Sequence, residues 1–352
     1  MSRNDPALNL VANLALAGAV SAMLVRPRHV AAVTHSPLLP AACRLTRFAA
    51  RTAGRQIAAK RTERGPRLPH LIARLAPASA VTHAAGRRLN SSAALLSFSV
   101  LADSALEHYR GSFQNRAMYT PLIVAALTLG ASLFGAADKR AASHPVRDTI
   151  YGGAAATGLA GFGFHAYNIL KRPGGLSWLN LFYSAPIGAP VAMTLAGFLG
   201  RGAEKVRDTP FLRRPKILGL PAGRMLAALS AIGLAGTVGE AGLLHFRGAF
   251  HNPAMVAPVT APPIAAALLS AATALPMRTT RSLARRWLQL TALLGLAGVG
   301  FHAYGISRNM GGWRNWSQNI LNGPPLPAPP SFTGLALAGL AALSLMEDAR
   351  DG

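Results

Sequence analysis

The chain has 352 residues, of which 51% are hydrophobic and only 14% charged, and its formal net charge is +24. Soluble globular proteins carry about 25% charged residues, so this composition, with its long runs of Ala, Leu, Gly and Val, predicts a membrane protein. The single cysteine, Cys43, excludes an intramolecular disulfide, a Cys-based zinc or iron–sulfur site and C-x-x-C-H haem attachment. Any metal or haem would therefore need His, Met or carboxylate ligands.

Residues 1–90 form a basic N-terminal segment, with 13 Arg and one Lys against only Asp5 and Glu63. Such a balance often indicates nucleic-acid binding, but no RNA- or DNA-binding motif accompanies it, and we expect no nucleic-acid partner. The apolar stretch 7–24 is not counted as a span, because a crossing there would export the arginine-rich residues 25–90. It can instead be a cleaved signal peptide. We expect residues 1–90 to be a disordered basic arm or an extension foreign to the natural protein.

The rest of the chain contains one sequence pattern twice. Three segments recur in the same order: HYRGSFQNRAM (108–118) as HFRGAFHNPAM (245–255), GLAGFGFHAYNI (158–169) as GLAGVGFHAYGI (295–306), and NLFYSAPIGAP (180–190) as NILNGPPLPAP (319–329). The first two matches have the same spacing along the chain, and a short insertion in the second copy lengthens the spacing of the third. This pattern predicts an internal repeat, with residues 91–210 as the first copy and 222–348 as the second.

Each predicted copy contains four apolar segments. They lie near 92–109, 119–137, 149–168 and 184–200, and near 225–244, 256–275, 287–304 and 331–346. The predicted fold is therefore all-α, a polytopic membrane helix bundle of about eight transmembrane helices arranged as two four-helix repeats. Because an even number of spans returns the chain to its starting side, the copies are expected to be parallel.

The basic loops predict which side faces the cytoplasm. Segments 138–148, 201–224 and 276–286 carry 14 Lys or Arg residues, against seven in the loops of the opposite side. We therefore place these loops and both termini in the cytoplasm, and expect a bacterial inner-membrane protein.

Repeat-matched residues gather on the predicted non-cytoplasmic side, which we call the histidine face. They are His108 and His245, Arg110 and Arg247, Met118 and Met255, His165 and His302, and Tyr167 and Tyr304. Asp103 and Glu240 occupy equivalent places inside their segments, five residues before His108 and His245. At 1.5 Å per residue this is about 7.5 Å below the histidines. An ionisable residue inside a span is a functional hypothesis by default.

Glycines precede the second histidine of each copy at the same spacing. Gly158 and Gly161 lie seven and four residues before His165, and Gly295 and Gly298 do the same for His302. A strip of bare backbone suits a flat ligand such as a porphyrin, but it equally allows neighbouring membrane helices to pack closely.

Four interpretations remain open. The histidines can hold b-type haem in an electron-transfer or anchor subunit that serves a periplasmic redox partner, with Met118 and Met255 as alternative axial ligands. The protein can instead bind or transport an anionic or lipid-like ligand, with Asp103 and Glu240 as proton relays. The third interpretation is a metalloenzyme that uses the same histidines, but no supporting motif such as H-E-x-x-H is present. The fourth is a purely structural or accessory protein, whose interfacial residues anchor it in the lipid bilayer. We expect no catalytic subunit acting on its own.

Overall fold

The computed structural model describes residues 80–348, except 141, 185, 210–212 and 276. Its long helices are α4 (Ala80–Arg110), α5 (Thr120–Ala137), α6 (Pro145–Leu170) and α8 (Gly188–Arg207) in the first half, and α9 (Ala222–Arg247), α10 (Ala261–Ala274), α11 (Arg278–Arg308) and α13 (Pro330–Asp348) in the second. The short helices are η2 (Arg116–Tyr119), α7 (Trp178–Tyr183), η3 (Pro253–Val259), η4 (Gly312–Asn315) and α12 (Trp316–Asn322). A small hairpin, β1 (Lys216–Ile217) and β2 (Leu220–Pro221), joins the halves.

Six helical segments among the described residues are long and apolar enough to cross a membrane. They are Ala80–Arg110, Arg116–Ala137, Ala222–Arg247, Pro253–Ala274, Arg278–Arg308 and Pro330–Asp348. Large apolar side chains such as Ile123, Leu293 and Phe301 are exposed on the outer helices, where lipid would cover them. The prediction of an all-α protein with membrane-type helices is confirmed.

Helices α6 and α8 are not among these six. The last two turns of α8 carry Arg201, Glu204, Lys205 and Arg207, and α6 is rich in glycine, so their hydropathy is lower. The corresponding helices of the second half, α11 and α13, both meet the length and composition of a span.

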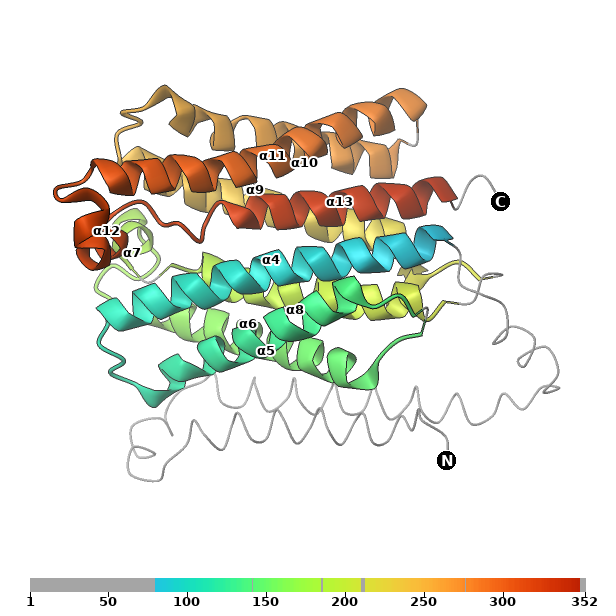
Figure 1. Ribbon diagram of the computed structural model, residues 1–352, viewed down its shortest axis with the longest axis horizontal. Helices are drawn as coiled ribbons and strands as arrows, with labels where there is room; N and C mark the ends of the chain where they lie inside the picture. The colour runs from blue at the N-terminus through green and yellow to red at the C-terminus, as the bar shows by residue number, and fades with distance from the viewer. Residues whose placement is uncertain (1–79, 141, 185, 210–212, 276, 349–352) are drawn as a thin grey trace. The chain divides into compact units, whose positions relative to one another are not determined.

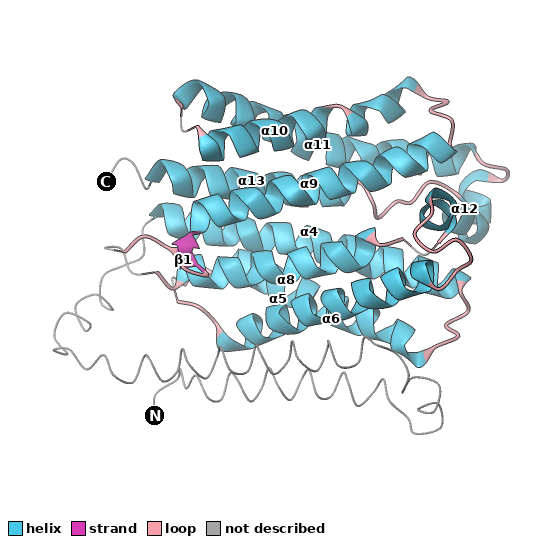
Figure 2. Ribbon diagram, turned by 180° about the vertical axis from the view of Figure 1, so that it is seen from behind, coloured by secondary structure: helices cyan, strands magenta, loops and turns pink. Residues whose placement is uncertain are grey.

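The two halves have the same neighbour relationships (Figures 1 and 2). In the first half α5 and α8 each contact both α4 and α6, and in the second half α10 and α13 each contact both α9 and α11. The halves meet through α4 with α13 and through α8 with α9. Fully buried leucines of four helices fill this junction, among them Leu96, Leu199, Leu234 and Leu335. Close packing of small and apolar side chains therefore holds the halves together.

The C-terminal ends of α4, α6, α9 and α11 lie at one end of this unit, together with α7 and α12 (Figure 1). The β1–β2 hairpin lies at the opposite end (Figure 2). Helix α4 begins at Ala80, and Leu89 and Asn90 are buried within the helical unit. Residues 80–90, which were expected to be part of the basic extension, therefore belong to the first helix. Residues 1–79, with the apolar stretch 7–24, lie outside the described part.

Candidate functional site

The first histidine of each half closes the loop that follows its helix. The imidazole Nδ1 of His108 lies 2.6 Å from the carbonyl oxygen of Met118, and that of His245 lies 2.8 Å from the carbonyl oxygen of Met255. Each ring also packs edge-on against a phenylalanine of the same loop, Phe113 or Phe250. The histidines thus connect the end of one long helix to the beginning of the next helical segment.

The backbone of this loop is strained in the same way in both halves. Ser112 and Phe113 have φ of 55° and 47°, and Ala249 and Phe250 have φ of 53° and 47°. Non-glycine residues rarely adopt this left-handed conformation, which costs about 1–3 kcal/mol each and persists only where surrounding contacts enforce it. The histidine-to-carbonyl hydrogen bonds are such contacts.

The second histidines form the same kind of bond. His165 Nδ1 lies 2.6 Å from the carbonyl oxygen of Pro186, and His302 Nδ1 lies 2.7 Å from that of Pro325. Because a carbonyl oxygen only accepts, Nδ1 of all four rings is the donor, and the neutral ring then has its lone pair on Nε2. Among the described residues no hydrogen bond engages these Nε2 atoms.

The histidines are paired within each half. His165 interacts electrostatically with His108, and His302 with His245. The sequence alone leaves open an exchange of partners across the copies. In the part of the chain that the structure describes, no group of three or more His, Cys, Asp or Glu side chains is close enough to hold a metal ion. A shared multi-ligand metal centre is therefore not assembled from these residues.

The two membrane carboxylates lie within electrostatic range of each other, on helices of different halves. Asp103 of α4 interacts electrostatically with Glu240 of α9. The Glu240 carboxylate also lies directly against Gly188, the first residue of α8. Gly188 is two residues after Pro186, whose carbonyl binds His165. A short backbone segment thus connects the acid pair to one of the histidines.

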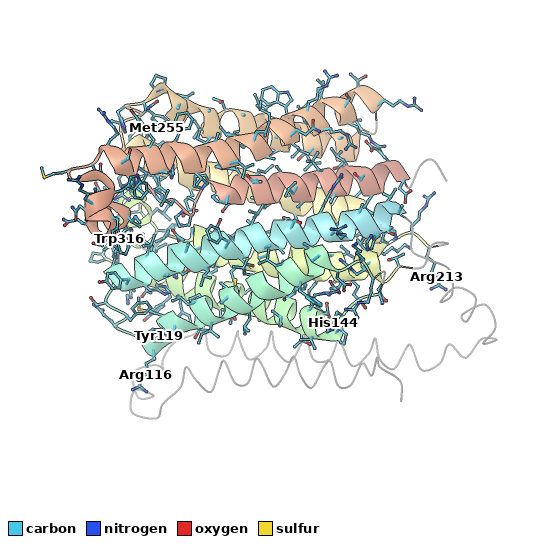
Figure 3. The ribbon with its side chains drawn as sticks, in the orientation of Figure 1. Arg116, Tyr119, His144, Arg213, Met255 and Trp316 are labelled. Atoms are coloured by element: carbon cyan, nitrogen blue, oxygen red, sulfur yellow. The ribbon has the colours of Figure 1, made fainter. Side chains whose placement is uncertain are left out.

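The two matched arginines have different partners. Arg110 forms an ion pair with Glu107, a residue without an acidic counterpart, because the second copy has Leu244 there. Arg247 instead lies over the ring of Phe182, 5.4 Å from its centroid. Figure 3 shows Tyr119, Met255 and Trp316 at this end of the helices and His144 toward the other.

The matched tyrosines are exposed. The ring of Tyr167 lies under Lys171 and is 49% exposed, and Tyr304 is 62% exposed. Such exposed rings at helix ends suit the membrane–water boundary.

The glycine strips are filled by neighbouring helices. A Cβ atom at Gly158 would overlap Thr194 of α8, and one at Gly295 would overlap Thr333 of α13. Gly161 and Gly298 face Pro190 and Pro329. The strips thus serve helix packing, as the second of the two interpretations expects, and offer no free face for a porphyrin.

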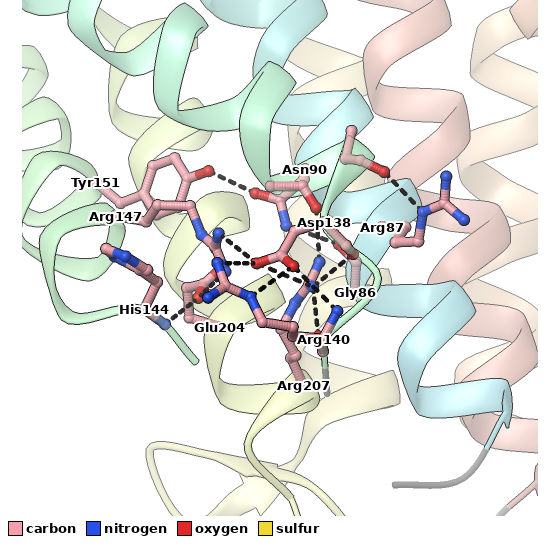
Figure 4. A network of polar contacts seen from close by, with 12 residues as sticks. Gly86, Arg87, Asn90, Asp138, Arg140, His144, Arg147, Tyr151, Glu204 and Arg207 are labelled. Carbon is pink, nitrogen blue, oxygen red and sulfur yellow. Dashed lines mark hydrogen bonds and ion pairs between the residues drawn. The ribbon is translucent and has the colours of Figure 1, made fainter. Parts of the chain in front are cut away.

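A buried ion network lies at the opposite end of the first half (Figure 4). Arg147 donates two hydrogen bonds of 3.0 Å to the Glu204 carboxylate and one of 2.9 Å to Asp138. Arg207 donates to the carbonyl oxygens of Gly135, Asp138 and Arg140. The side chains of Arg147, Glu204 and Arg207 are at most 3% exposed. The network anchors the α5–α6 loop on the end of α8.

The second half has no equivalent of this network at the matching sequence positions. When the copies are aligned on their shared motifs, Asp138, Arg147, Glu204 and Arg207 correspond to Leu275, Ala284, Leu343 and Met346. The last three are buried in the apolar core. In the sequence, the arginines of the network indicate only topology. A position-by-position comparison of the two copies was the signal that would have found the network.

Two surface pockets of the described residues lie beside arginines. One is next to Arg110, and the other is next to Arg278 and Arg286; no histidine lines either of them. The histidine face is thus a set of matched polar groups at helix ends beside an open pocket. No family model, curated protein or solved structure matches the chain.

Proposed function

We propose that the chain is a bacterial inner-membrane protein of eight transmembrane helices, built as two parallel four-helix copies, with both termini in the cytoplasm. Six helices have the length and composition of spans, and α6 and α8 take the same places among their neighbours as α11 and α13. The histidine face then lies on the non-cytoplasmic side, because the basic loops gather at the other end.

Cysteine labelling tests this topology. In a Cys43→Ser background, single Ser112→Cys and Ala249→Cys variants should both react with a membrane-impermeant maleimide added to intact cells. Lys139→Cys should react only after permeabilisation. Reaction of the Ser112 and Ala249 positions from opposite sides would contradict a parallel arrangement.

We propose further that this protein binds an anionic or lipid-like ligand at the histidine face and uses Asp103 and Glu240 to carry a proton. The observation that carries the proposal is the placement of Glu240, whose carboxylate lies directly against Gly188 of the other half and within electrostatic range of Asp103. Two carboxylates within electrostatic range of each other in a low-dielectric span repel one another when both are ionised, so the pair favours holding one proton. Arg110 and Arg247 at the ends of the same two helices supply positive charge for an anionic group.

Infrared spectroscopy tests the shared proton. Purified protein at neutral pH should show the carbonyl-stretch band of a protonated carboxylic acid. Asp103→Asn with Glu240→Gln should remove the band. Glu347→Gln, which changes a carboxylate of α13 that pairs with Arg285, should keep it. A wild-type spectrum with no such band would contradict the proposal.

Ligand binding is tested with decanoate, an amphipathic anion. Decanoate should raise the unfolding temperature of the wild type in detergent, and the Asp103→Asn, Glu240→Gln double variant should lose most of that rise. Glu347→Gln should retain it. Equal stabilisation of all three proteins would remove the two acids from ligand binding.

A second candidate function is b-type haem binding in an electron-transfer or anchor subunit. One observation favours it: all four imidazoles donate from Nδ1 to carbonyl oxygens, and this leaves Nε2 as the potential iron ligand. Protein produced with ample haem should then show a Soret band and a sharp α-band on reduction. A colourless preparation would remove this candidate.

Asparagine variants distinguish the hydrogen bond that each imidazole donates from Nδ1 from iron ligation by Nε2. The amide nitrogen of asparagine occupies the place of Nδ1, so His165→Asn and His302→Asn keep the donor to the carbonyl but remove Nε2. These variants should fold and lose haem if haem is bound. His251→Asn, on an exposed histidine of the same end, is the control. Retention of the haem spectrum by both site variants would exclude these histidines as ligands.

A further inference from the structure

An open pocket lies beside Arg110 in the first half. The pocket has a volume of about 540 Å³, within the range of small-molecule sites. Its lining residues include Tyr109, Arg110, Ser112 and Tyr119 of the first half, and Leu321 and Asn322 of α12 in the second half. Helix α12 thus crosses to the loop of the other half and completes the pocket.

At the equivalent place in the second half, two rings of the protein occupy the space beside the arginine. Helix α7 of the first half crosses in the same manner, so that Arg247 lies over Phe182 at 5.4 Å and over Tyr183 at 5.8 Å. Phe182 also packs edge-on against Phe246 at 6.2 Å. Two aromatic rings, one of them a phenol, therefore lie against this guanidinium, although Arg247 stays exposed.

The two crossing helices differ at the residues that cover the arginines. In the third repeated motif, Phe182 and Tyr183 correspond to Leu321 and Asn322. An isobutyl group and a carboxamide replace two rings, so the guanidinium of Arg110 keeps open space beside it.

Residues that carry hydroxyl groups line the open pocket, whereas the corresponding residues of the second half carry none. When the copies are aligned on the first repeated motif, Tyr109, Ser112 and Tyr119 correspond to Phe246, Ala249 and Val256. A place filled by the protein's own rings needs no hydroxyl groups around it. A pocket that receives a polar ring from outside needs hydrogen-bonding groups to orient that ring.

We propose that the Arg110 pocket binds a phenolic ring. The ring would lie over Arg110 as Phe182 and Tyr183 lie over Arg247, a cation–π contact. Its hydroxyl would bind the hydroxyl groups of the lining. The ligand comes either from the bilayer, as a hydroquinone or phenol with an apolar tail, or from the aqueous phase as a free phenol. The proposal names the ring of the lipid-like ligand and rests on the membrane placement proposed above, but it does not depend on the acid pair.

The probes are octyl 4-hydroxybenzoate, methyl 4-hydroxybenzoate and octanol, titrated calorimetrically against the full chain in lipid nanodiscs. Both esters should bind saturably and octanol should not. Tighter binding of the octyl ester assigns the bilayer as the source, and equal binding assigns the aqueous phase. Absence of saturable ester binding, or equal binding of octanol, overturns the proposal.

The rings that lie against Arg247 in the second half indicate which substitutions should fill the Arg110 pocket. Leu321→Phe with Asn322→Tyr should weaken binding at least about tenfold, a difference of about 1.4 kcal/mol. Phe182→Leu with Tyr183→Asn, the mirror-image change, should leave the Arg110 pocket and its affinity unchanged. Undiminished binding to the filled variant overturns the proposal.

Two further variants test the pocket in case the filled variant does not fold, and test whether phenol binding depends on Asp103 and Glu240. If the filled variant does not fold, Tyr109→Phe with Ser112→Ala tests the same pocket by removing two hydroxyl groups, and unchanged affinity would overturn the proposal. The Asp103→Asn, Glu240→Gln variant should still bind the phenol. Phenol binding by this variant would show that the pocket works without the proton-carrying pair, so that either proposal can fail without the other.

Discussion

The carboxylate of Glu240 lies directly against Gly188, the first residue of α8, so that a glycine of the first half accommodates an acid of the second. Only hydrogen in place of a side chain leaves room for this contact, since a Cβ at Gly188 would coincide with the carboxylate. The acid pair, the N-terminal end of α8 and the His165–Pro186 hydrogen bond therefore form one continuous region. A change at any of these places should affect the others.

Gly188→Ala should displace Glu240 and destabilise the protein by about 1–3 kcal/mol, as overpacking in a closed site does. The measurement is thermal unfolding in detergent. Gly163→Ala is the control, because a Cβ there meets open space in the middle of α6. An alanine in a helix at an unobstructed site is neutral or stabilising by up to about 1 kcal/mol. Equal stability of the two variants would contradict the close contact.

The glycine strips predict that alanine substitutions destabilise both halves in the same way. Gly158→Ala and Gly295→Ala should each lower the unfolding temperature, because Thr194 and Thr333 occupy the space of the new methyl group. Gly300→Ala, where a Cβ meets open space, should not. A porphyrin face would predict the reverse order: harmless alanines in the haem-free protein and loss of haem on reconstitution.

Glu204→Gln should be strongly destabilising. It removes the charge that binds Arg147 in a region where both side chains are at most 3% exposed. Breaking one partner of a buried ion pair typically costs about 3–5 kcal/mol. Glu347→Gln, on the more exposed pair with Arg285, should cost less than about 1 kcal/mol. A similar effect of both changes, measured by thermal or chemical unfolding, would show that the network is not buried in the native protein.

Replacing the whole network with the residues of the second half tests whether the first half needs these charges to fold. The combination Asp138→Leu, Arg147→Ala, Glu204→Leu and Arg207→Met reproduces Leu275, Ala284, Leu343 and Met346. Replacing a buried ion network with apolar side chains is often neutral or stabilising. We expect the quadruple variant to be far more stable than Glu204→Gln alone. A variant as unstable as the single change would indicate that the first half needs these charges to fold.

The pH dependence of stability should report on Asp138. Burial by itself would raise the pKa of Asp138, but hydrogen bonds from Arg140 and Arg147 hold it well below its ordinary value. A carboxyl with a lowered native pKa stabilises the fold above the pKa of the unfolded chain and loses this contribution as the pH falls. The unfolding temperature should therefore drop below about pH 4. Asp138→Asn should show a weaker drop, and an identical acid profile would contradict the assignment.

His108→Ala should destabilise the first loop by about 1 kcal/mol or more, because the hydrogen bond to Met118 is lost while the strained residues Ser112 and Phe113 remain. His108→Asn retains a donor at the position of Nδ1 and should recover most of the loss. His245→Ala and His245→Asn should repeat the result. If asparagine gives no recovery in either half, the hydrogen bond is not the stabilising element.

Much of this molecule is predictable from the sequence because the relevant signals are local. Hydropathy depends on stretches of consecutive residues, so the apolar segments coincide with the long helices, although α4 begins earlier than its hydropathy indicates, at Ala80. The duplicated motifs place His108, His165, His245 and His302 at equivalent helix ends without any knowledge of contacts. Equivalence between copies, however, contains no information about which side chains face one another.

The tertiary structure alone decided how these residues are used. Helix packing brings Glu240 of α9 against Gly188 of α8 and within electrostatic range of Asp103 of α4, and it covers the strips at Gly158 and Gly295 with α8 and α13. The crossing of α7 and α12 between the halves places two rings against one arginine and leaves the other beside an open pocket. The physical reason is that membrane helices associate through shape and polar contacts between distant segments. A pattern along the sequence specifies which face of a helix is apolar, but it does not specify which helix covers that face.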